Sequence, residues 1–399
     1  MRHPMLPALF LLAGTIALAG CTESASDETK ADAKPEVPGA VQPEAPKPDY
    51  RLAILHINDH HSNLDESDAS LRLRTGSDDT RTSVTVKLGG FPRVTAAMAE
   101  LSARHDNVLK LHAGDAITGT LYYTLSEGKA DAALMNGVCF DAMAVGNHEL
   151  DSGDAGLKTF IDHLWSAPAC RTPVLSANLA PRAGSPLGSD SVRPSVVIER
   201  GGEPIGVVGL TTAAKTQNAS RPDPGTLLLD EVDSAQREID RLRAQGIDKI
   251  VLLSHLGYTQ DQAIAAQLSG VDVIVGGDSH SLLGDDSLRD YGLSPVGAYP
   301  TVAADKDGNT VCIAQAWQYS AVVGELEVVF DGRGKVKSCG GQPHVLIGST
   351  LGTLSGDALT FAQADLARQP ALRVTAPNAQ AASVLADYTR QVTDFGAEP

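Results

Sequence analysis

The chain has 399 residues and a formal net charge of −17, from 32 lysines and arginines against 49 aspartates and glutamates. This charge, with no dense cluster of lysine or arginine, argues against a protein that holds nucleic acid, because phosphate backbones are bound by clustered cations. From residue 50 onward the chain is long enough for one large α/β domain or two ordinary ones, and we expect one large domain.

The first residues have the pattern of an export signal. Residues 1–20 carry basic residues ahead of an apolar run, 9–18, that is too short to span a bilayer. The run leads into Leu18-Ala19-Gly20-Cys21, which resembles the lipobox of bacterial lipoproteins, so Cys21 is expected to carry a lipid anchor at a membrane; soluble secretion is the alternative. The expected location is the cell envelope, at the outer membrane facing the periplasm or the exterior. Residues 21–49 are rich in proline and alanine, which predicts a disordered tether.

From residue 50 onward, short apolar runs alternate with stretches of helical periodicity, which predicts an α/β domain over residues 50–345. Strands are expected at residues 52–57, 108–112, 142–145, 174–177, 205–210, 250–254 and 271–275. Helices are expected at residues 92–104, 129–136, 232–245 and 259–269. In open α/β sheets, ligands gather beyond the carboxyl ends of the strands, so polar residues at those points are site candidates.

Polar residues of metal-binding type follow five of the expected strands. In chain order they are Asp59 and His61, Asp115, Asn147 and His148, His255, and Asp278 and His280. Residues two apart in an extended segment face the same side, so Asp59 and His61 can meet one ion, although such a pair alone is a weak signal. Two divalent ions about 4 Å apart need roughly seven or eight mixed oxygen and nitrogen ligands, with one carboxylate as a bridge. The five clusters together supply that set.

Two strings carry a family resemblance. Ile54-Leu55-His56-Ile57-Asn58-Asp59-His60-His61 and Gly146-Asn147-His148-Glu149-Leu150-Asp151 resemble motifs of the calcineurin-like metallophosphoesterases, and within them of bacterial 5′-nucleotidases. The resemblance implies a four-layer α/β/β/α sandwich with mixed sheets. It also implies a two-metal hydrolase of nucleotide phosphate esters or anhydrides, such as AMP or NAD. The alternatives are a cyclic nucleotide phosphodiesterase and a catalytically impaired surface lipoprotein that binds metal or nucleotide.

The resemblance also implies a role for each polar residue. One ion is assigned to Asp59, His61 and His280, the second to Asn147, His255 and Asp278, and Asp115 bridges the two. The ions are expected to be manganese, zinc, cobalt or magnesium. His148 is expected to stabilise transition-state charge or protonate the leaving oxygen, with Asp151 orienting its ring. Asp151 could also cap the following helix.

One expected ligand departs from the family pattern. Most relatives have Gly-His-x-His or Gly-His-x-Gln where this chain has Gly277-Asp278-Ser279-His280. A carboxylate still binds metal, and its charge favours manganese or magnesium over zinc. The alternative is that Asp278 caps a turn and the second ion is held more weakly. This string and Lys215-Thr216-Gln217-Asn218 are similar to the branch that includes NAD nucleotidases.

The remaining four cysteines are an even number in an exported chain, which predicts two disulfides. The β-like runs at residues 310–318 and 322–330 could bring Cys312 near Cys339, and Cys139 is paired less firmly with Cys170. Free thiols are the alternative.

The end of the chain is expected to prepare for a second domain. Full-length relatives continue into a nucleotide-binding domain, and residues 346–399 are interpreted as its remnant with a linking helix at 377–395. The domain itself is expected to be lacking or encoded separately, which predicts broad and weak activity because remote binding contributes to turnover.

Several other polar residues are given structural roles. His56 is expected in the core, His60 and His112 are expected to support the site, and Asn178 is a candidate substrate contact. His105, His163 and His344 are expected at the surface.

Overall fold

In the computed structural model, residues 47–397 are described. The expected signal peptide, the expected lipidation site Cys21 and most of the expected tether lie outside these residues. Within the described part of the chain, no helix is both long enough and apolar enough to cross a bilayer.

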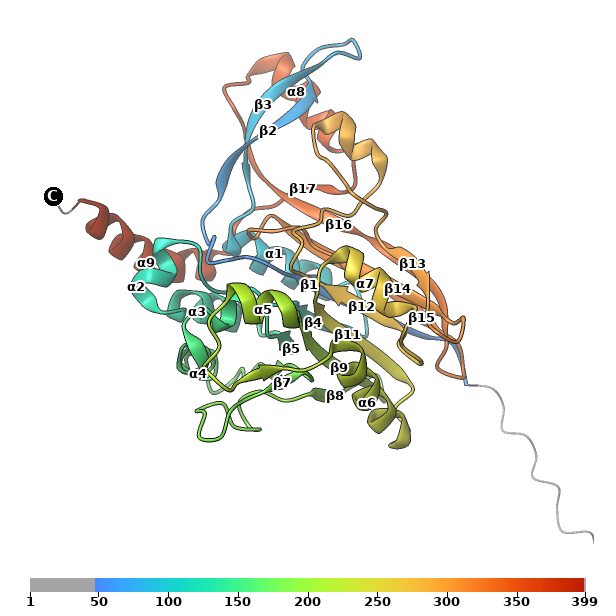
Figure 1. Cartoon of the computed structure of the whole chain (residues 1–399). Coiled ribbons are helices and arrows are strands. Elements are labelled where there is room, and N and C mark those ends of the chain that lie inside the picture. Colours follow the sequence, from blue (N-terminus) through green and yellow to red (C-terminus); the bar gives the residue numbers. More distant parts are fainter. Residues whose placement is uncertain (1–46, 398–399) are drawn as a thin grey trace, which may run out of the picture. The chain divides into compact units, whose positions relative to one another are not determined.

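Two β-sheets pack face to face in the centre of the domain (Figure 1). The larger sheet has the order β2 (Ser67–Arg74), β3 (Arg81–Leu88), β16 (Val336–Leu351), β15 (Val322–Phe330), β1 (Tyr50–Ile57), β4 (Val108–His112), β5 (Ala142–Ala144) and β6 (Val174–Leu175), with β17 (Leu372–Val374) beside β16. The smaller sheet has the order β13 (Thr301–Ala304), β14 (Thr310–Gln315), β12 (Val273–Gly276), β11 (Lys249–His255), β9 (Glu203–Thr211) and β8 (Ser195–Arg200). β7 (Leu179–Ala180) and β10 (Leu227–Leu228) form a separate short ladder. Both sheets are mixed, because β1 is parallel to β4 and antiparallel to β15, and β14 is parallel to β12 and antiparallel to β13.

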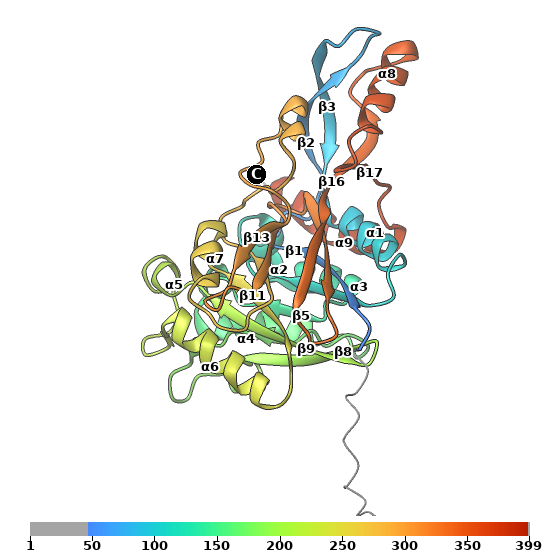
Figure 2. The ribbon, with the colours of Figure 1, turned by 90° about the vertical axis from the view of Figure 1, so that its right-hand side faces the viewer.

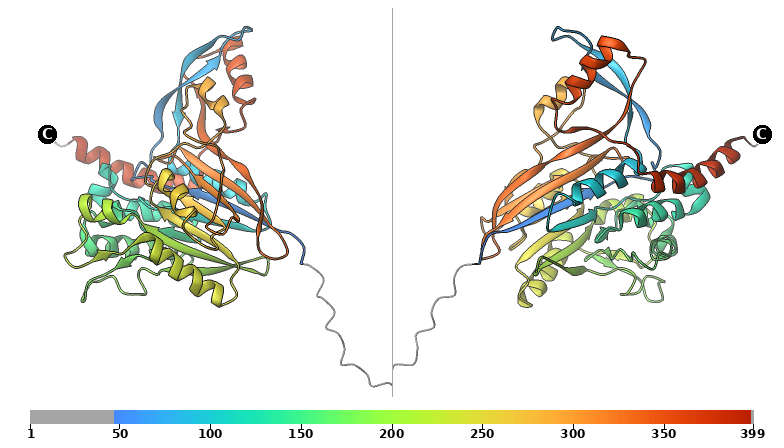
Figure 3. Two further views of the ribbon diagram at one scale, coloured as in Figure 1. Left: turned by 45° about the vertical axis from the view of Figure 1, so that its right-hand side comes forward. Right: turned by 180° about the vertical axis from the view of Figure 1, so that it is seen from behind.

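Helices cover the outer faces of both sheets. Their bounds are α1 (Phe91–Ser102), α2 (Leu121–Ser126), α3 (Lys129–Val138), α4 (Gly153–Leu164), α5 (Ala213–Ala219), α6 (Glu231–Ala244), α7 (Tyr258–Ala265), α8 (Gly356–Leu366) and α9 (Ala379–Ala397), with short 3₁₀ turns η1 (His148–Leu150) and η2 (Asp286–Tyr291). Helices α1, α3, α4 and α9 pack on the larger sheet, and α6 and α7 pack on the smaller one (Figures 2 and 3). The expected four-layer α/β/β/α sandwich is confirmed.

Strand β1 explains why its sequence is an unbroken apolar run. Leu52 and Ile54 point into the core between the sheets, while Leu55 and Ile57 point to the core under α1 and α3. Side chains alternate between the faces of a strand, so a strand buried on both faces needs apolar residues at every position. β1 therefore fixes the place of the loop that follows it.

Two disulfides join distant segments. Cys312 of β14 is bonded to Cys339 of β16, with Cα atoms 5.7 Å apart, and this bond links the smaller sheet to the larger one. Cys139, at the end of α3, is bonded to Cys170, with Cα atoms 5.5 Å apart. These are the pairings expected from the sequence.

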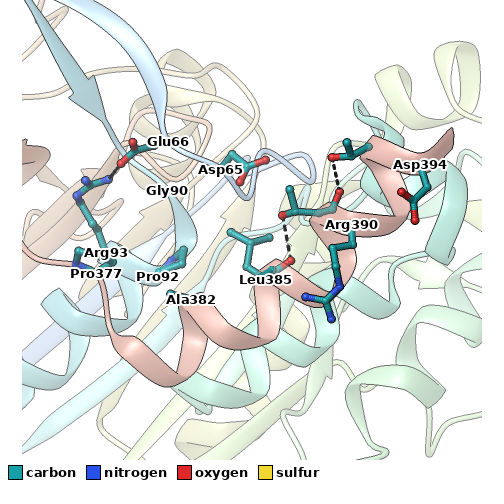
Figure 4. A pocket seen from close by; sticks show the side chains of 13 residues that line it. Asp65, Glu66, Gly90, Pro92, Arg93, Pro377, Ala382, Leu385, Arg390 and Asp394 are labelled. Carbon is teal, nitrogen blue, oxygen red and sulfur yellow. Dashed lines mark hydrogen bonds and ion pairs between the residues drawn. The ribbon is translucent and has the colours of Figure 1, made fainter. Parts of the chain in front are cut away.

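The last segments of the described chain pack on the same cores. The expected boundary after residue 345 falls inside β16, and β17 pairs with that strand. Helix α9 buries Ala381 and Leu385 in the core that contains α1 and α3. Figure 4 shows Ala382 and Leu385 beside a groove of about 500 Å³, with the Arg93–Glu66 ion pair at one end.

A cluster of two histidines and a buried glutamate joins the segment after α1 to the larger sheet. Glu325 of β15 lies 2.7 Å from the Nε2 atom of His105 and 2.8 Å from the Nε2 atom of His344. His344 is only 1% exposed, so the prediction that it lies at the surface was wrong. Its position in β16 directs its side chain inward, beside Glu325. Burial alone would raise the pKa of Glu325, but hydrogen bonds from the two histidines lower it to about 2.

This cluster predicts a pH-dependent contribution to stability. The pKa of Glu325 is lower in the folded protein than its usual 4.5, so its contribution is present above pH 4.5 and is lost as the pH falls toward 2. We expect Glu325→Gln to lower the free energy of unfolding at pH 7 and the difference from wild type to shrink below pH 4.5. Urea unfolding across this range measures it, with the exposed Glu127→Gln as control. An equal difference at pH 7 and pH 3 would contradict the assignment.

Candidate metal centre

The expected metal ligands come from both sheets and meet where their strands end. The loops after β1, β4 and β5 of the larger sheet carry Asp59 with His61, Asp115, and Asn147. β11 ends at His255, and the loop after β12 carries Asp278 and His280. The site therefore lies at the shared edge of the sandwich, rather than at the edge of a single open sheet.

The ligand atoms form overlapping groups. Three groups of three side chains each have ligand atoms that lie within 4.8 Å of one another. The groups are Asp59, His61 and His280; His61, Asp115 and His148; and Asp59, Asp115 and His255. An Asp115 oxygen lies 3.6 Å from the Nε2 atom of His61 and 3.1 Å from that of His255. Asp115 thus stands between the two expected ligand sets, where a bridging carboxylate would be.

Two buried atoms indicate that the cluster fits cations. The Nδ1 atom of His255 donates to the carbonyl of Ala113 at 2.7 Å, so the Nε2 atom, 3.1 Å from an Asp115 oxygen, is the one that could bind a cation. This atom and the Oδ1 atom of Asn147 are buried without a hydrogen-bond partner in the described part of the chain. Buried polar atoms are normally hydrogen-bonded, so unpartnered lone pairs beside two carboxylates fit divalent metal ions.

The backbone of the ligand loops is strained. Five of the seven expected ligands adopt positive φ angles, a region that residues with side chains rarely occupy: Asp59 (48°), His61 (46°), Asp115 (54°), Asp278 (75°) and His280 (49°). Such strain costs about 1–3 kcal/mol per residue and persists where the surroundings enforce it, typically at functional sites.

Glycines allow the loops to approach closely. A Cβ atom at Gly277 would lie 2.6 Å from the carbonyl oxygen of Ala113, and one at Gly146 would overlap the carboxylate of Asp115. Gly114 also has a φ of 90°, as expected for a sharp turn after a strand. Glycine is therefore required after these strands for two reasons: the sharp turn of the backbone and the close contact between the loops.

The expected catalytic pair is in contact. The Nδ1 atom of His148 lies 2.6 Å from an Asp151 oxygen, and this hydrogen bond raises the pKa of His148. The residue before α4 is Ser152, and α4 has no side-chain cap, so Asp151 orients His148 and does not cap the helix. By contrast, burial lowers the pKa of His61 to about 4.

A cavity of about 610 Å³ opens over the cluster. Its walls are formed by His61, Asn63, Asp115, Thr118, Gly119, His148, Asp151, Lys215, Asp278, His280 and Tyr319. Asn178, the candidate substrate contact, is not among them. Its buried carboxamide binds the backbone of Thr211 and Leu229 instead, so its role is structural.

Glu149, for which no role was expected from the sequence, organises the site. Its buried carboxylate accepts hydrogen bonds from the backbone N–H groups of Gly146 (2.7 Å), Asp115 (2.9 Å) and Ala116 (2.7 Å). Burial and the charge of Asp115 raise the pKa of Glu149 to about 7. One side chain thus ties the loop after β5 to the loop after β4.

A buried histidine chain supports the same loops. Gly114 N–H donates to the Nδ1 atom of His112 (3.2 Å), so the Nε2 atom of His112 donates to the Nδ1 atom of His60 (2.9 Å). The Nε2 atom of His60 then donates to Asp131 of α3 (3.1 Å). The expected supporting roles of His60 and His112 agree with these contacts, and His56 is a core residue bonded to Tyr299.

The family model described as calcineurin-like phosphoesterase matches residues 52–282. The chain belongs to this family. It is 41% identical to a probable 5′-nucleotidase of Treponema pallidum over 88% of this chain and 58% of that protein. It is 42% identical to the NAD 5′-nucleotidase of Haemophilus influenzae over 75% of this chain and 47% of that protein.

Solved structures agree with this assignment. The Haemophilus influenzae NAD nucleotidase superposes with a TM-score of 0.81 at 37% identity, covering 88% of this chain and 62% of that one. The 5′-nucleotidase precursor of Thermus thermophilus superposes with a TM-score of 0.72 at 34% identity, covering 88% and 60%. The chain spans about half the length of the curated relatives it matches.

Glu149 provides a test of how the site is held together. Glu149→Gln turns an amide NH2 toward buried backbone N–H donors, so we expect the free energy of unfolding to fall by about 1–3 kcal/mol, the usual cost of a buried donor left without an acceptor. Urea unfolding of the metal-free protein measures it. Glu127→Gln, at an exposed position, is the control. Equal stability of Glu149→Gln and wild type would show that the loops hold without this carboxylate.

Proposed function

We propose that this protein hydrolyses phosphate esters or anhydrides of nucleotides with the help of two divalent metal ions. The observation that carries the proposal is the convergence of Asp59, His61, Asp115, His255 and His280 from two sheets. Beside them, buried atoms of His255 and Asn147 have no hydrogen-bond partner among the described residues. The names of two similar proteins, a probable 5′-nucleotidase and an NAD 5′-nucleotidase, support nucleotides as substrates.

Each residue has a role in this reaction. The residues that would hold one ion are Asp59, His61 and His280, those that would hold the other are Asn147, His255 and Asp278, and Asp115 would bridge the two. When bound, the metal ions lower the pKa of a shared water and neutralise charge on the phosphoryl oxygens. The carboxylate of Asp278 favours manganese or magnesium over zinc.

His148 is the proton donor of the proposal. Its Nδ1 atom is hydrogen-bonded to Asp151, so the Nε2 atom is the one available to a substrate in the cavity that His148 lines. The protonated ring can donate to a phosphoryl oxygen or to the leaving oxygen, and the Asp151 carboxylate stabilises that charged form. Asp115 also accepts a hydrogen bond from the backbone N–H of His148 (2.9 Å), which sets the position of the ring relative to the ligands.

We also propose that the protein is exported and anchored to a membrane of the cell envelope by a lipid on Cys21. The apolar run that leads into Leu18-Ala19-Gly20-Cys21 supports this proposal.

The anchor predicts a change of cell fraction. Cys21→Ser should move the protein from the membrane fraction to the soluble fraction and abolish incorporation of labelled fatty acid. Fractionation and labelling of the full chain measure both. Membrane association that survives Cys21→Ser, with no label in wild type, would contradict the anchor.

The proposed reaction predicts different effects for its two kinds of residue. Asp59→Ala should abolish hydrolysis of AMP and NAD and weaken metal binding. His148→Ala should lower kcat by about 10²–10⁴-fold, the usual contribution of a general acid, and leave metal binding unchanged. His163→Ala, in α4, is the matched control.

Turnover with manganese, cobalt or zinc, together with calorimetric metal titration, measures these effects. Hydrolysis that persists with chelator or in Asp59→Ala would overturn the two-metal proposal. Turnover of a cyclic nucleotide alone would favour a phosphodiesterase, and bound metals without any turnover would favour a binding protein.

A further inference from the structure

The cavity over the metal centre has one formal cation in its wall. Among the described residues that line it, Lys215 of α5 is the only lysine or arginine, while Asp115, Asp151 and Asp278 are acidic. The Nζ atom of Lys215 forms an ion pair with the Oδ1 atom of Asp278. A cavity for an anionic substrate thus offers one ammonium group outside the ligand cluster.

Asp278 is held rigidly between Lys215 and the ligand set. Its backbone N–H donates to Asp59 at 3.0 Å, and its φ angle of 75° is fixed by that turn. Its Oδ1 atom lies 3.8 Å from the Nε2 atom of His255, whose lone pair is unpartnered. The same carboxylate therefore faces the place of the second ion and holds the lysine.

The Asp278–Lys215 pair has no net charge, because the carboxylate and the ammonium cancel. The pair therefore places a cation beside the cavity without adding net positive charge next to the ligand cluster. The ammonium stands on a flexible four-carbon stem, so it can reach from Asp278 toward a bound anion.

We propose that Lys215 binds a phosphate group of the substrate other than the one that is attacked, and that the preferred substrates are therefore nucleotides with a pyrophosphate. This rests on the proposed function. The metal ions and His148 would contact the reacting phosphate, which leaves Lys215 free to bind a neighbouring phosphate. The ion pair with Asp278 keeps Lys215 at the wall of the cavity.

The proposal predicts a selective effect of Lys215→Met. A hydrogen bond to a charged group is worth about 1.5–3 kcal/mol, which corresponds to about 10–150-fold. With manganese, kcat/KM for NAD should fall by that factor, mainly through KM, while kcat/KM for AMP changes by less than about threefold. Metal affinity should stay equal or increase, because a positive charge is removed beside the ion. Lys215→Arg should restore NAD turnover.

A matched control is Lys158→Met, which removes the lysine of an exposed Lys158–Asp162 pair on α4, outside the cavity. Equal losses for NAD and AMP, or no loss for either, in Lys215→Met would overturn the proposal while leaving the proposed function in place. Absence of turnover of both substrates by wild type would instead contradict the proposed function.

A binding measurement is independent of turnover. The affinity for the nonhydrolysable α,β-methylene analogue of ADP, by calorimetry with manganese, should fall about 10–150-fold in Lys215→Met. In Asp278→His, where the lysine is no longer held, the same substitution should have a much smaller effect, so that the two are non-additive. Additive effects, or no binding of the analogue by wild type, would overturn the proposal.

Discussion

The carboxylate and backbone of Asp59 hold together the loops on which the site depends. Its N–H donates to the carbonyl of Gly114 (3.0 Å), and its own carbonyl accepts from Tyr319 (2.9 Å). Its carboxylate accepts from the backbone N–H of Asp278 (3.0 Å). Loops after β1, β4, β12 and β14 thus meet at one residue. Because these strands belong to two sheets, the metal centre forms only when the sandwich is assembled.

Bound cations would stabilise this arrangement further. Asp59 and Asp115 are buried carboxylates, and the Nε2 atoms of His61 and His280 share a hydrogen bond of 3.1 Å. The loops also hold five ligands in strained backbone conformations. The core between the sheets and the Cys312–Cys339 bond hold this strain in place. A ligand that binds only the folded state stabilises it, so the fold and its metal ions support each other.

The sequence predicted the features that have a local pattern. The apolar run of β1 and the polar residues after five strands were visible without structure. Features formed by distant residues were not. Glu149 binds backbone more than 30 residues away, and Asp131 meets His60 from another helix. The β2–β3 hairpin was missed because β2 buries only Leu71 and Leu73, too few for a clear alternation.

If two ions bind at the shared edge of the two sheets, anomalous diffraction from crystals grown with manganese should show two peaks about 4 Å apart. Asp115 should lie between the peaks, with one peak beside Asp59, His61 and His280 and the other beside Asn147, His255 and Asp278. A single peak, or peaks away from these side chains, would contradict the two-metal proposal.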